Sequence, residues 1–335
     1  MNLISPTIRR RMLRSLALSI VTVMLLISTI KIALPENNSV TIACVNFHAV
    51  WGDKATNLKR IKDYIAEAAK KGADIIIFPE LALTGYDIER EVRMHKENAE
   101  TIPGSSTNEI AVLTRQYGVY VVVGMPEISK NDPDVVYNSA AVVGPEGVIG
   151  SYAKLMPFGS EMKWCKKGEK PFAINTPWGP VGIAICYDSY MFPELPRYYA
   201  ALGARLYLHI TAIAAFTEWK EYYQNQLEAR AVENMMFVAS SNLCGKDLTT
   251  NFPGTSFVVG PGEVAHVIKY YAGPASEDRE EIVMAKVDLA KADRMRKNYP
   301  LFQRNRFSGM PDWRLKLYKA MLKTIDEKTD LGKYD

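Results

Sequence analysis

The chain lacks the residue clusters that usually identify a metalloprotein or a redox protein. None of its four cysteines belongs to a CxxC pair, so we expect neither a zinc knuckle nor a redox dithiol. Its four histidines are widely spaced and form no HExxH or other close group of metal ligands. The sequence therefore predicts no metal site.

Motifs for binding nucleotides and nucleic acids are also missing. There is no GxxxxGK[ST] loop, no dinucleotide glycine fingerprint and no basic stripe with interleaved aromatic residues. The net charge of +4 comes partly from one N-terminal cluster of arginines, so it does not indicate a nucleic-acid surface. Hydrophobic residues make up 48% of the 335 residues and charged residues 23%, which is ordinary for a globular protein.

The first 35 residues differ from the rest of the chain. Residues 1–14 contain four arginines and no acidic residue, and Ser15–Ile30 carries no charge. This pattern is typical of a signal peptide or a single membrane-spanning anchor. No small-x-small cleavage site follows it, which favours an uncleaved anchor. Because clustered arginines stay in the cytoplasm, we expect everything after Pro35 to be extracytoplasmic, or secreted if the segment is cleaved.

Beyond a short polar linker, predicted strands and helices alternate without a repeat or a second domain boundary. Apolar runs predict the strands and helical spacing predicts the helices, which indicates the α/β class. The expected strands are Val40–Val45, Ala73–Glu80, Val119–Gly124, Asn138–Val143, Pro171–Ile174, Leu206–Ile213, Phe237–Ser241, Thr255–Val259 and Ile282–Val287. The expected helices are Asn57–Ala69, Thr107–Tyr117, Trp219–Asn234 and a charged tail from about Trp313 that could dock on a partner subunit.

Cys186 lies where an apolar run ends abruptly. The run VGIAICYD, Val181–Asp188, predicts a buried strand that emerges at a sheet edge. Pro193 and Glu194 suit the start of the helix that follows. Backbone N–H groups and a positive helix end near such a turn would favour a thiolate. Considered alone, a cysteine that closes such an apolar run is more often an inert core residue than a nucleophile.

Two other apolar runs lead to a reactive side chain. Glu80 follows ADIIIFP, and Lys154 lies within SYAKLMPF. Either residue alone has a commoner structural interpretation, as a carboxylate at a helix start or as a solvated charge. Together with Cys186 they form a set of an acid or base, a cation and a nucleophile.

At these three places the sequence resembles the nitrilase superfamily of carbon–nitrogen hydrolases, over about Val40 to Gly309. The resemblance implies a four-layer α-β-β-α sandwich, assembly into homodimers or larger homo-oligomers, and no metal or organic cofactor. We accordingly expect residues 1–35 to be the anchor or signal and residues 36–335 to be the hydrolase domain. The matching blocks are FPELALTGYD, YNSAAVVGPEGVIGSYAKLMPFGSE, GIAICYDSYMFPEL, ARAVENMMFVASSN and GTSFVVGPGEV.

The resemblance implies a catalytic triad that cleaves a small-molecule amide. Cys186 would attack the carbonyl and form a thioester, and Glu80 would carry protons between thiol, amine and water. Lys154 and the backbone N–H of Tyr187 would face the oxyanion. Glu161 fits the place of a second glutamate that orients Lys154 or the substrate amine.

Residues near these motifs are expected to form the pocket. Tyr86 and Phe158 are candidates for its lining, and Phe158, Trp164, Phe216 and Trp219 suggest an apolar wall. His209 is expected to be a core or lining histidine, with nothing that places it beside Cys186. Glu233 is expected to pair with Arg230 or a backbone amide.

The branch of the superfamily is indicated by two short patterns. Tyr187-Asp188 after the cysteine is similar to amide-hydrolysing members, whereas nitrile-cleaving members typically have Trp-Glu there. KLMPFGSE is similar to a block of apolipoprotein N-acyltransferases, which carry a multi-helix membrane domain that this chain does not show. We therefore expect an amidase, with acyl transfer, a nitrilase or a non-catalytic binding domain as alternatives. Because the mechanism needs a free thiol, we expect no essential disulfide.

Overall fold

The computed structural model describes residues 37–87, 93–216, 218–264, 266–302, 308–310 and 312–329. All of them belong to the unit Asn37–Asp335. The predicted anchor at residues 1–35 lies outside the described residues. In the part of the chain that is described, no helix combines the length and the apolar character needed to cross a membrane.

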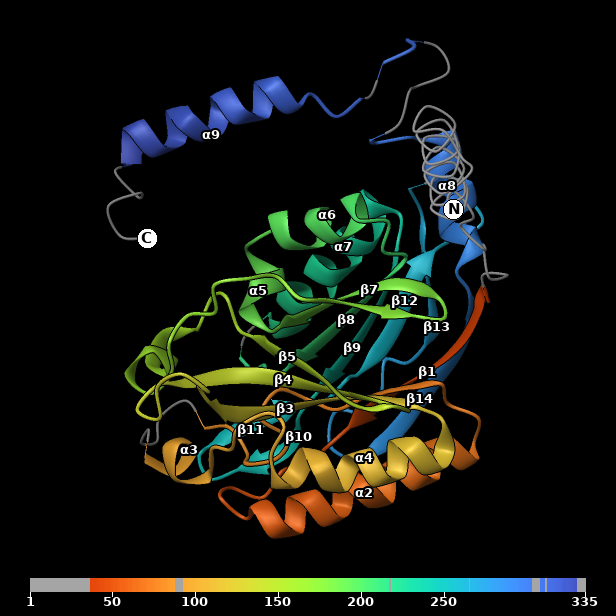
Figure 1. The fold of residues 1–335 in the computed structure, drawn as a ribbon. Coiled ribbons are helices and arrows are strands. Elements are labelled where there is room, and N and C mark those ends of the chain that lie inside the picture. The colour runs from red at the N-terminus through yellow and green to blue at the C-terminus, as the bar shows by residue number, and fades with distance from the viewer. Residues whose placement is uncertain are drawn as a thin grey trace, which may run out of the picture. The chain divides into compact units, whose positions relative to one another are not determined.

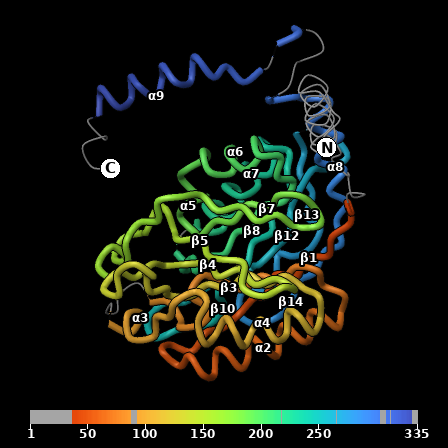
Figure 2. The backbone as a smooth tube through the Cα atoms, in the orientation of Figure 1, coloured from red at the N-terminus to blue at the C-terminus, as the bar shows by residue number. Residues whose placement is uncertain are grey.

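The first of two six-stranded sheets in the described residues is built mainly from the N-terminal half of the chain. Its strands β1, β2 and β3 run parallel, and β14, β4 and β5 add antiparallel strands. Strand β14 joins β1 with Ser39 opposite Asp288, so two segments far apart in the sequence pair with each other (Figure 2). The strand order is β14 (Glu281–Asp288), β1 (Ser39–Asn46), β2 (Ile75–Ile77), β3 (Tyr120–Ile128), β4 (Val136–Gly144) and β5 (Gly147–Ala153).

The second sheet has the same mixed character. Strands β7, β8 and β9 are parallel, and β6, β12 and β13 are antiparallel to their neighbours. A separate hairpin consists of β10 (Cys244–Asp247) and β11 (Thr250–Pro253). The order in the second sheet is β13 (Ile268–Ala272), β12 (Phe257–Pro261), β9 (Phe237–Asn242), β8 (Leu206–Thr211), β7 (Gly179–Ile185) and β6 (Ala173–Thr176).

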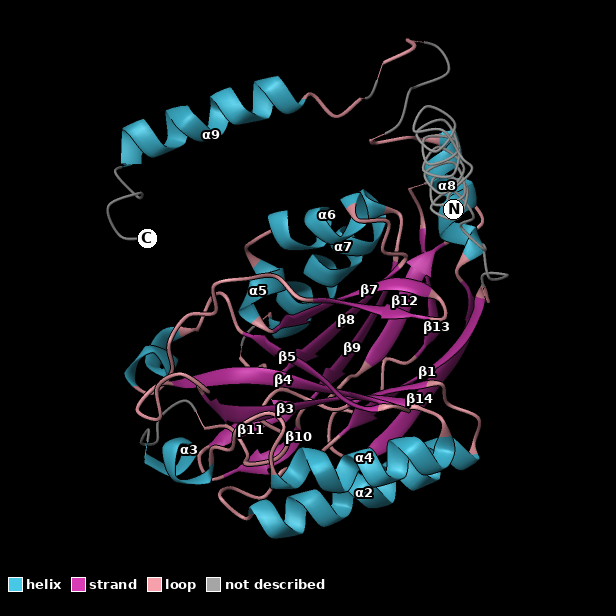
Figure 3. Cartoon of the chain, viewed as in Figure 1, coloured by secondary structure: helices cyan, strands magenta, loops and turns pink. Residues whose placement is uncertain are grey.

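Helices cover the outer face of each sheet (Figures 1 and 3). The pair α2 (Lys54–Lys70) and α4 (Ser105–Tyr117) packs on the first sheet, and α5 (Tyr187–Tyr190), α6 (Glu194–Ala201) and α7 (Gln226–Asn234) pack on the second. The arrangement is the four-layer α-β-β-α sandwich expected from the resemblance. The other described helices are α3 (Arg93–Asn98), α8 (Ala290–Asn298), α9 (Leu315–Thr329), the 3₁₀ turn Gly159–Lys163 and the π-helical turn Glu221–Asn225.

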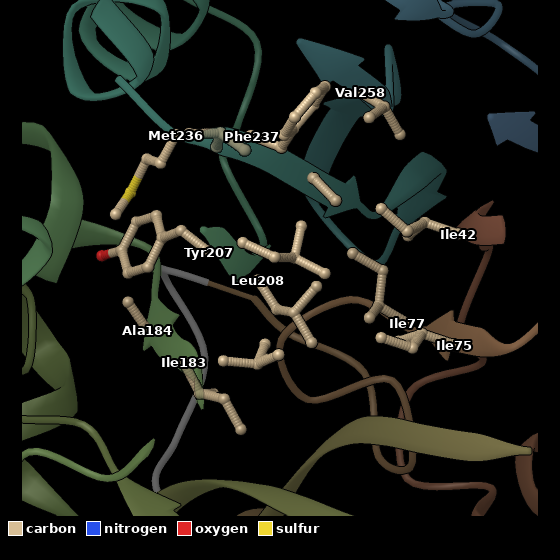
Figure 4. Packing of buried hydrophobic residues seen from close by; sticks show 14 of the residues in the cluster. Ile42, Ile75, Ile77, Ile183, Ala184, Tyr207, Leu208, Met236, Phe237 and Val258 are labelled. Carbon is tan, nitrogen blue, oxygen red and sulfur yellow. The ribbon is translucent and has the colours of Figure 1, made fainter. Parts of the chain in front are cut away.

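Successive side chains of a strand point to opposite faces of its sheet, so each strand contributes to two separate cores. In β1, Ile42 and Cys44 belong to the core between the sheets, whereas Ala43 and Val45 belong to the core under α2 and α4. Figure 4 shows residues of the inter-sheet core, with Ile75 and Ile77 from the first sheet and Leu208 and Ile183 from the second. Burying each such aliphatic side chain contributes about 1.5 to 3 kcal/mol. Because both strand faces are buried, the strands read as continuous apolar runs.

The structure changes several predicted boundaries. The strand expected at Ala73–Glu80 ends at Ile77, because the chain then turns away from the sheet. The helix expected at Trp219–Asn234 opens with the π-helical turn Glu221–Asn225. The hairpin, β13, α3 and α8 were not predicted at all, because their short segments lack a clear apolar period.

Candidate active site

Glu80 lies on a tight turn that packs against β3. Leu81, the next residue, has φ 51°, and Gly124 N donates to Pro79 O at 3.2 Å. A Cβ at Gly124 would collide with the backbone of Pro79, Glu80 and Leu81. Glycine at position 124 is therefore what allows the Glu80 turn to approach the neighbouring strand so closely.

The structure brings three of the predicted residues into one buried cluster. Lys154 Nζ donates to Glu80 Oε1 at 2.7 Å and to Glu161 Oε1 at 2.8 Å. Glu80 and Lys154 are fully buried, and Glu161 is almost so. We call Glu80, Lys154 and Glu161 the charged cluster. A buried ammonium between two carboxylates keeps a fixed geometry, since removing Lys154 would leave two buried carboxylates without a cation.

Neutral donors hold the two carboxylates of the charged cluster in place. Asn138 Nδ2 donates to Glu80 Oε1 at 2.8 Å and to Glu161 Oε2 at 3.3 Å. The Tyr86 hydroxyl donates to Glu161 Oε1 at 2.8 Å, and Ala212 N donates to Glu80 Oε2 at 2.9 Å. Each carboxylate oxygen therefore has a partner before any substrate binds.

Burial and mutual charge tune the proton affinity of the charged cluster. Burial raises the pKa of Glu80, and Glu161 raises it further, against the opposing effect of Lys154. Burial alone would lower the pKa of Lys154, but Glu161 and Glu80 raise it well above its ordinary value. Lys154 therefore stays cationic, and Glu80 is a stronger base than a solvated carboxylate.

Cys186 occupies a strained turn between β7 and α5. Its φ of 51° and ψ of −112° are rare for a residue with a side chain. Its N–H donates to Ile210 O at 2.9 Å, and its carbonyl accepts from Ser189 N at 3.0 Å and from His209 Nε2 at 3.1 Å. These three hydrogen bonds offset the strain and hold the backbone of the turn in place.

The thiol of Cys186 lies within the field of the charged cluster. Burial raises its pKa, Glu80 and Glu161 raise it further, and Lys154 and a hydrogen bond from Thr211 oppose the rise. Burial and the two carboxylates therefore outweigh the expected stabilisation of a thiolate by the turn, and Cys186 is protonated before the reaction. Nucleophilic attack requires a base that takes the thiol proton, and Glu80 is the raised-pKa carboxylate beside it.

His209 corrects one expectation from the sequence. It is a fully buried core residue, as expected, yet it contacts the backbone of Cys186. Its Nδ1 pairs with Ser240 Oγ at 2.9 Å, and burial lowers its pKa to about 3. A neutral imidazole that donates to a carbonyl supports the turn and is not a general base for the thiol.

A cavity of about 320 Å³ opens beside Cys186. The predicted residues Tyr86, Phe158 and Tyr187 line it, as does Phe216 from the expected apolar wall. Two other members of that wall do not. Trp164 is buried and stacks on His95 with ring centroids 4.3 Å apart, and Trp219 is not among the lining residues.

Asp188 connects the nucleophile turn to the segment that follows Lys154. It is buried and accepts hydrogen bonds from Tyr152 Oη at 2.7 Å, Met156 N at 2.8 Å and Ile185 N at 3.2 Å. Its place after the cysteine indicated the branch of the superfamily but not this supporting role. An acidic residue directly after an apolar run was the available signal for a positioning role, because a carboxylate at such a place is rarely buried unless it is paired.

Arg230 supports the same turn from α7. Its guanidinium donates to the carbonyls of Ser189 at 2.8 Å and Tyr190 at 2.9 Å, and it pairs with Glu233 at 3.1 Å. The predicted Arg230–Glu233 pairing is confirmed. Among the described residues, no group of three or more His, Cys, Asp or Glu side chains is arranged to hold a metal ion.

Comparison with known proteins identifies the family. The carbon–nitrogen hydrolase family model matches residues 41–297. The chain belongs to the carbon–nitrogen hydrolase family. This confirms the predicted enzyme class, and the amidases among its relatives agree with the predicted amidase-like branch.

Relatives of this carbon–nitrogen hydrolase carry both amidase and nitrilase names. It is 32% identical to a probable nitrilase of Schizosaccharomyces pombe, over 84% of this chain and 98% of the relative. It is 31% identical to omega-amidase NIT2 of Homo sapiens, over 76% of this chain and 90% of that protein. A solved mutant of the amidase from Nesterenkonia sp. AN1 is 26% identical, with a TM-score of 0.63 over 78% of this chain and 94% of that one. That structure contains the acetamide moiety of fluoroacetamide, covalently added at its active-site cysteine.

Proposed function

We propose that this carbon–nitrogen hydrolase is an amidase that cleaves non-peptide carboxamides through a thioester on Cys186. The observation that carries the proposal is the charged cluster, whose Glu80, Lys154 and Glu161 all act on the pKa of the Cys186 thiol. The thiol also lines a cavity, so a substrate carbonyl can reach it.

Acylation follows from the protonation states of the charged cluster. As the sulfur of Cys186 bonds to the amide carbon, the thiol proton moves to Glu80, which is the stronger base because of burial. The carbonyl oxygen becomes an oxyanion that Lys154 and the Tyr187 N–H stabilise. The carbon–nitrogen bond then breaks, and protonated Glu80 gives its proton to the departing ammonia or amine.

Deacylation repeats the same steps with water. Water attacks the thioester carbon while Glu80 takes one of its protons, and the carbon–sulfur bond breaks. The proton returns to the sulfur and the carboxylic acid leaves. Glu161 acts through Lys154, since it keeps the ammonium charged and oriented without contact with the reacting atoms.

The test is release of ammonia or amine from a panel of carboxamides, N-carbamoyl compounds and nitriles. Intact mass should reveal an acyl adduct on Cys186 that Cys186→Ala abolishes and Cys244→Ala retains. Hydrolysis of nitriles but not of amides would reassign the chain to the nitrilases. An adduct that turned over only with an added amine would indicate acyl transfer, and an unreactive Cys186 would indicate a binding domain.

We also propose, from the sequence of residues 1–35 alone, a single-pass membrane anchor with the catalytic domain on the extracytoplasmic side. Fractionation of cells should recover the full chain with membranes and a chain that starts at Glu36 in the soluble fraction. A thiol reagent that does not cross membranes should label Cys186 in intact cells. Recovery of both chains in the soluble fraction would refute the anchor.

A homodimer or larger homo-oligomer is proposed as well. None of the residues of α9 is buried, and its apolar residues Leu315, Tyr318, Leu322 and Ile325 are exposed at helical spacing. Such a stripe is typical of a helix that packs on a partner. Light scattering should give at least twice the monomer mass, and a monomer at micromolar concentration would refute the proposal.

A further inference from the structure

The cavity beside Cys186 is lined by apolar and aromatic side chains. Its volume of about 320 Å³ lies at the lower end of the range for ligand pockets. An engineered cavity of about 150 Å³ is enough to hold benzene, so this one can hold a ring with a short chain. The lining residues are Tyr86, Phe158, Cys186, Tyr187, Tyr190, Ala212, Ile213, Ala214, Ala215, Phe216 and Tyr222.

Three backbone N–H groups along one wall of the cavity already donate hydrogen bonds to other groups of the protein. Ala212 N donates to Glu80 Oε2 at 2.9 Å, and Ile213 N donates to Asn242 Oδ1 at 3.0 Å. Ala215 N donates to Asn251 O at 2.8 Å. These three amide groups are therefore not available to a substrate, and the wall offers methyl and aliphatic groups instead.

Two of the lining tyrosines also use their hydroxyl groups inside the protein. Tyr86 Oη donates to Glu161, and Tyr190 Oη pairs with Thr211 Oγ1 at 2.8 Å. The Tyr222 ring packs against Tyr190 and Phe216, with centroids 5.1 and 5.8 Å apart. The aromatic rings thus form a continuous apolar surface along this side of the cavity.

The cations near the cavity have fixed partners. Among the residues that the structure describes, no lysine or arginine side chain lines the cavity. Lys154 lies in the charged cluster, where both Glu80 and Glu161 hold its ammonium group. A carboxylate on the acyl group would therefore lose its hydration and gain no cationic partner, which is strongly unfavourable.

We propose that the acyl group of the substrate is uncharged and apolar, with an aromatic ring or a branched alkyl chain. This inference rests on the proposed amidase function and specifies its substrate class. An aromatic acyl group would pack against Phe158, Tyr187 and Phe216, while its carboxamide reaches Cys186. Aromatic pairs of this kind contribute about 0.5 to 1.5 kcal/mol beyond their buried area.

The experiment compares kcat/KM of the full-length chain for two amides of equal size. In 4-methylpentanamide an isopropyl group stands where succinamate has a carboxylate, so the two differ mainly in charge. We expect the neutral amide to be preferred by about 100-fold or more, and 3-phenylpropanamide to be a better substrate than either. Equal or faster hydrolysis of succinamate would overturn the inference and leave the amidase function intact.

A variant at the cavity wall tests the cause of this preference. Phe216 is 49% exposed, so Phe216→Arg adds a cation without burying it. We expect it to reduce the preference for 4-methylpentanamide over succinamate at least about tenfold, while the matched Phe216→Leu leaves that preference unchanged. An unchanged preference in Phe216→Arg would contradict the role of charge. Failure of all amides, with Cys186 unlabelled by iodoacetamide, would refute the amidase function and this inference together.

Discussion

Cys186 and Cys165 lie close to the same charged cluster but differ in what they can do. Burial raises the pKa of both thiols, to about 12 for Cys165, and Glu161 and Lys154 influence both. Cys165 is buried after the 3₁₀ turn that carries Glu161. Cys186 lies on a strained turn and lines the cavity. Proximity to the acid and the lysine is therefore not sufficient for a nucleophile, because the thiol must also border a space where a substrate fits.

The largest expected effect is the difference in kcat/KM between a variant that lacks the Cys186 thiol and one that lacks the Cys165 thiol. We expect Cys186→Ala to lower kcat/KM on the order of 10⁴-fold or more, because the bond-forming atom is lost. Cys165→Ala should remain within about threefold of the unmodified enzyme, since Cys165 is not among the residues that line the cavity. Both values come from ammonia release, and circular dichroism checks that each variant is folded. Comparable losses of kcat/KM in the two variants would contradict this difference between the two thiols.

The second-largest loss of activity should follow substitution of Lys154, because its ammonium stabilises the charge that develops during the reaction. We expect Lys154→Met to lower kcat by about 10²- to 10³-fold, the usual effect of losing an oxyanion donor. It should also reduce the free energy of unfolding by about 3 to 5 kcal/mol, since Glu80 and Glu161 would remain buried without their cation. Urea unfolding measures the second effect. The exposed neighbour Lys167 supplies the control, and an equal loss in Lys167→Met would contradict a specific role for Lys154.

The pH dependence should report the raised pKa of Glu80. As the proton acceptor, Glu80 must be ionised in the free enzyme, and burial raises its pKa above the ordinary 4.5. We expect kcat/KM to be constant on the alkaline side of this pKa and to fall about tenfold per pH unit below it. A profile that stayed flat down to pH 4.5 would contradict this assignment. Asp188→Asn serves as a control that should retain the acidic limb.

The sequence predicted the fold and the reactive residues better than it predicted the residues that hold the reactive side chains in place. Glu80, Lys154 and Cys186 stand at the ends of apolar runs inside recognisable motifs, so their residue type and position were visible. Asn138 and His209 were not assigned supporting roles, because each acts through a partner distant in sequence. Asn138 lies 58 residues from Glu80, and His209 lies 23 residues from Cys186. Such contacts depend on strand register, which local patterns do not determine.

Among the residues expected to act in the reaction or to support it, Asp188 should have the smallest effect on kcat, and it accepts a hydrogen bond from Ile185 N beside Cys186. Burial raises its pKa from 3.8 to about 6, against the opposing effect of Lys154. The folded state therefore binds this proton more tightly than the unfolded state. Its contribution to stability is present below pH 3.8 and is lost as the pH rises to about 6, by at most about 3 kcal/mol.

Asp188→Asn removes this titration and should lower kcat only about tenfold, because the Cys186 turn keeps its bonds to Ile210, Ser189 and His209. Urea unfolding between pH 4 and pH 7 should show the free energy of unfolding of the unmodified enzyme falling relative to that of the variant. Identical pH slopes for the two proteins would mean that Asp188 does not titrate in this range. A loss of activity as large as that of Cys186→Ala would instead mean that the turn depends on Asp188 alone to aim the thiol.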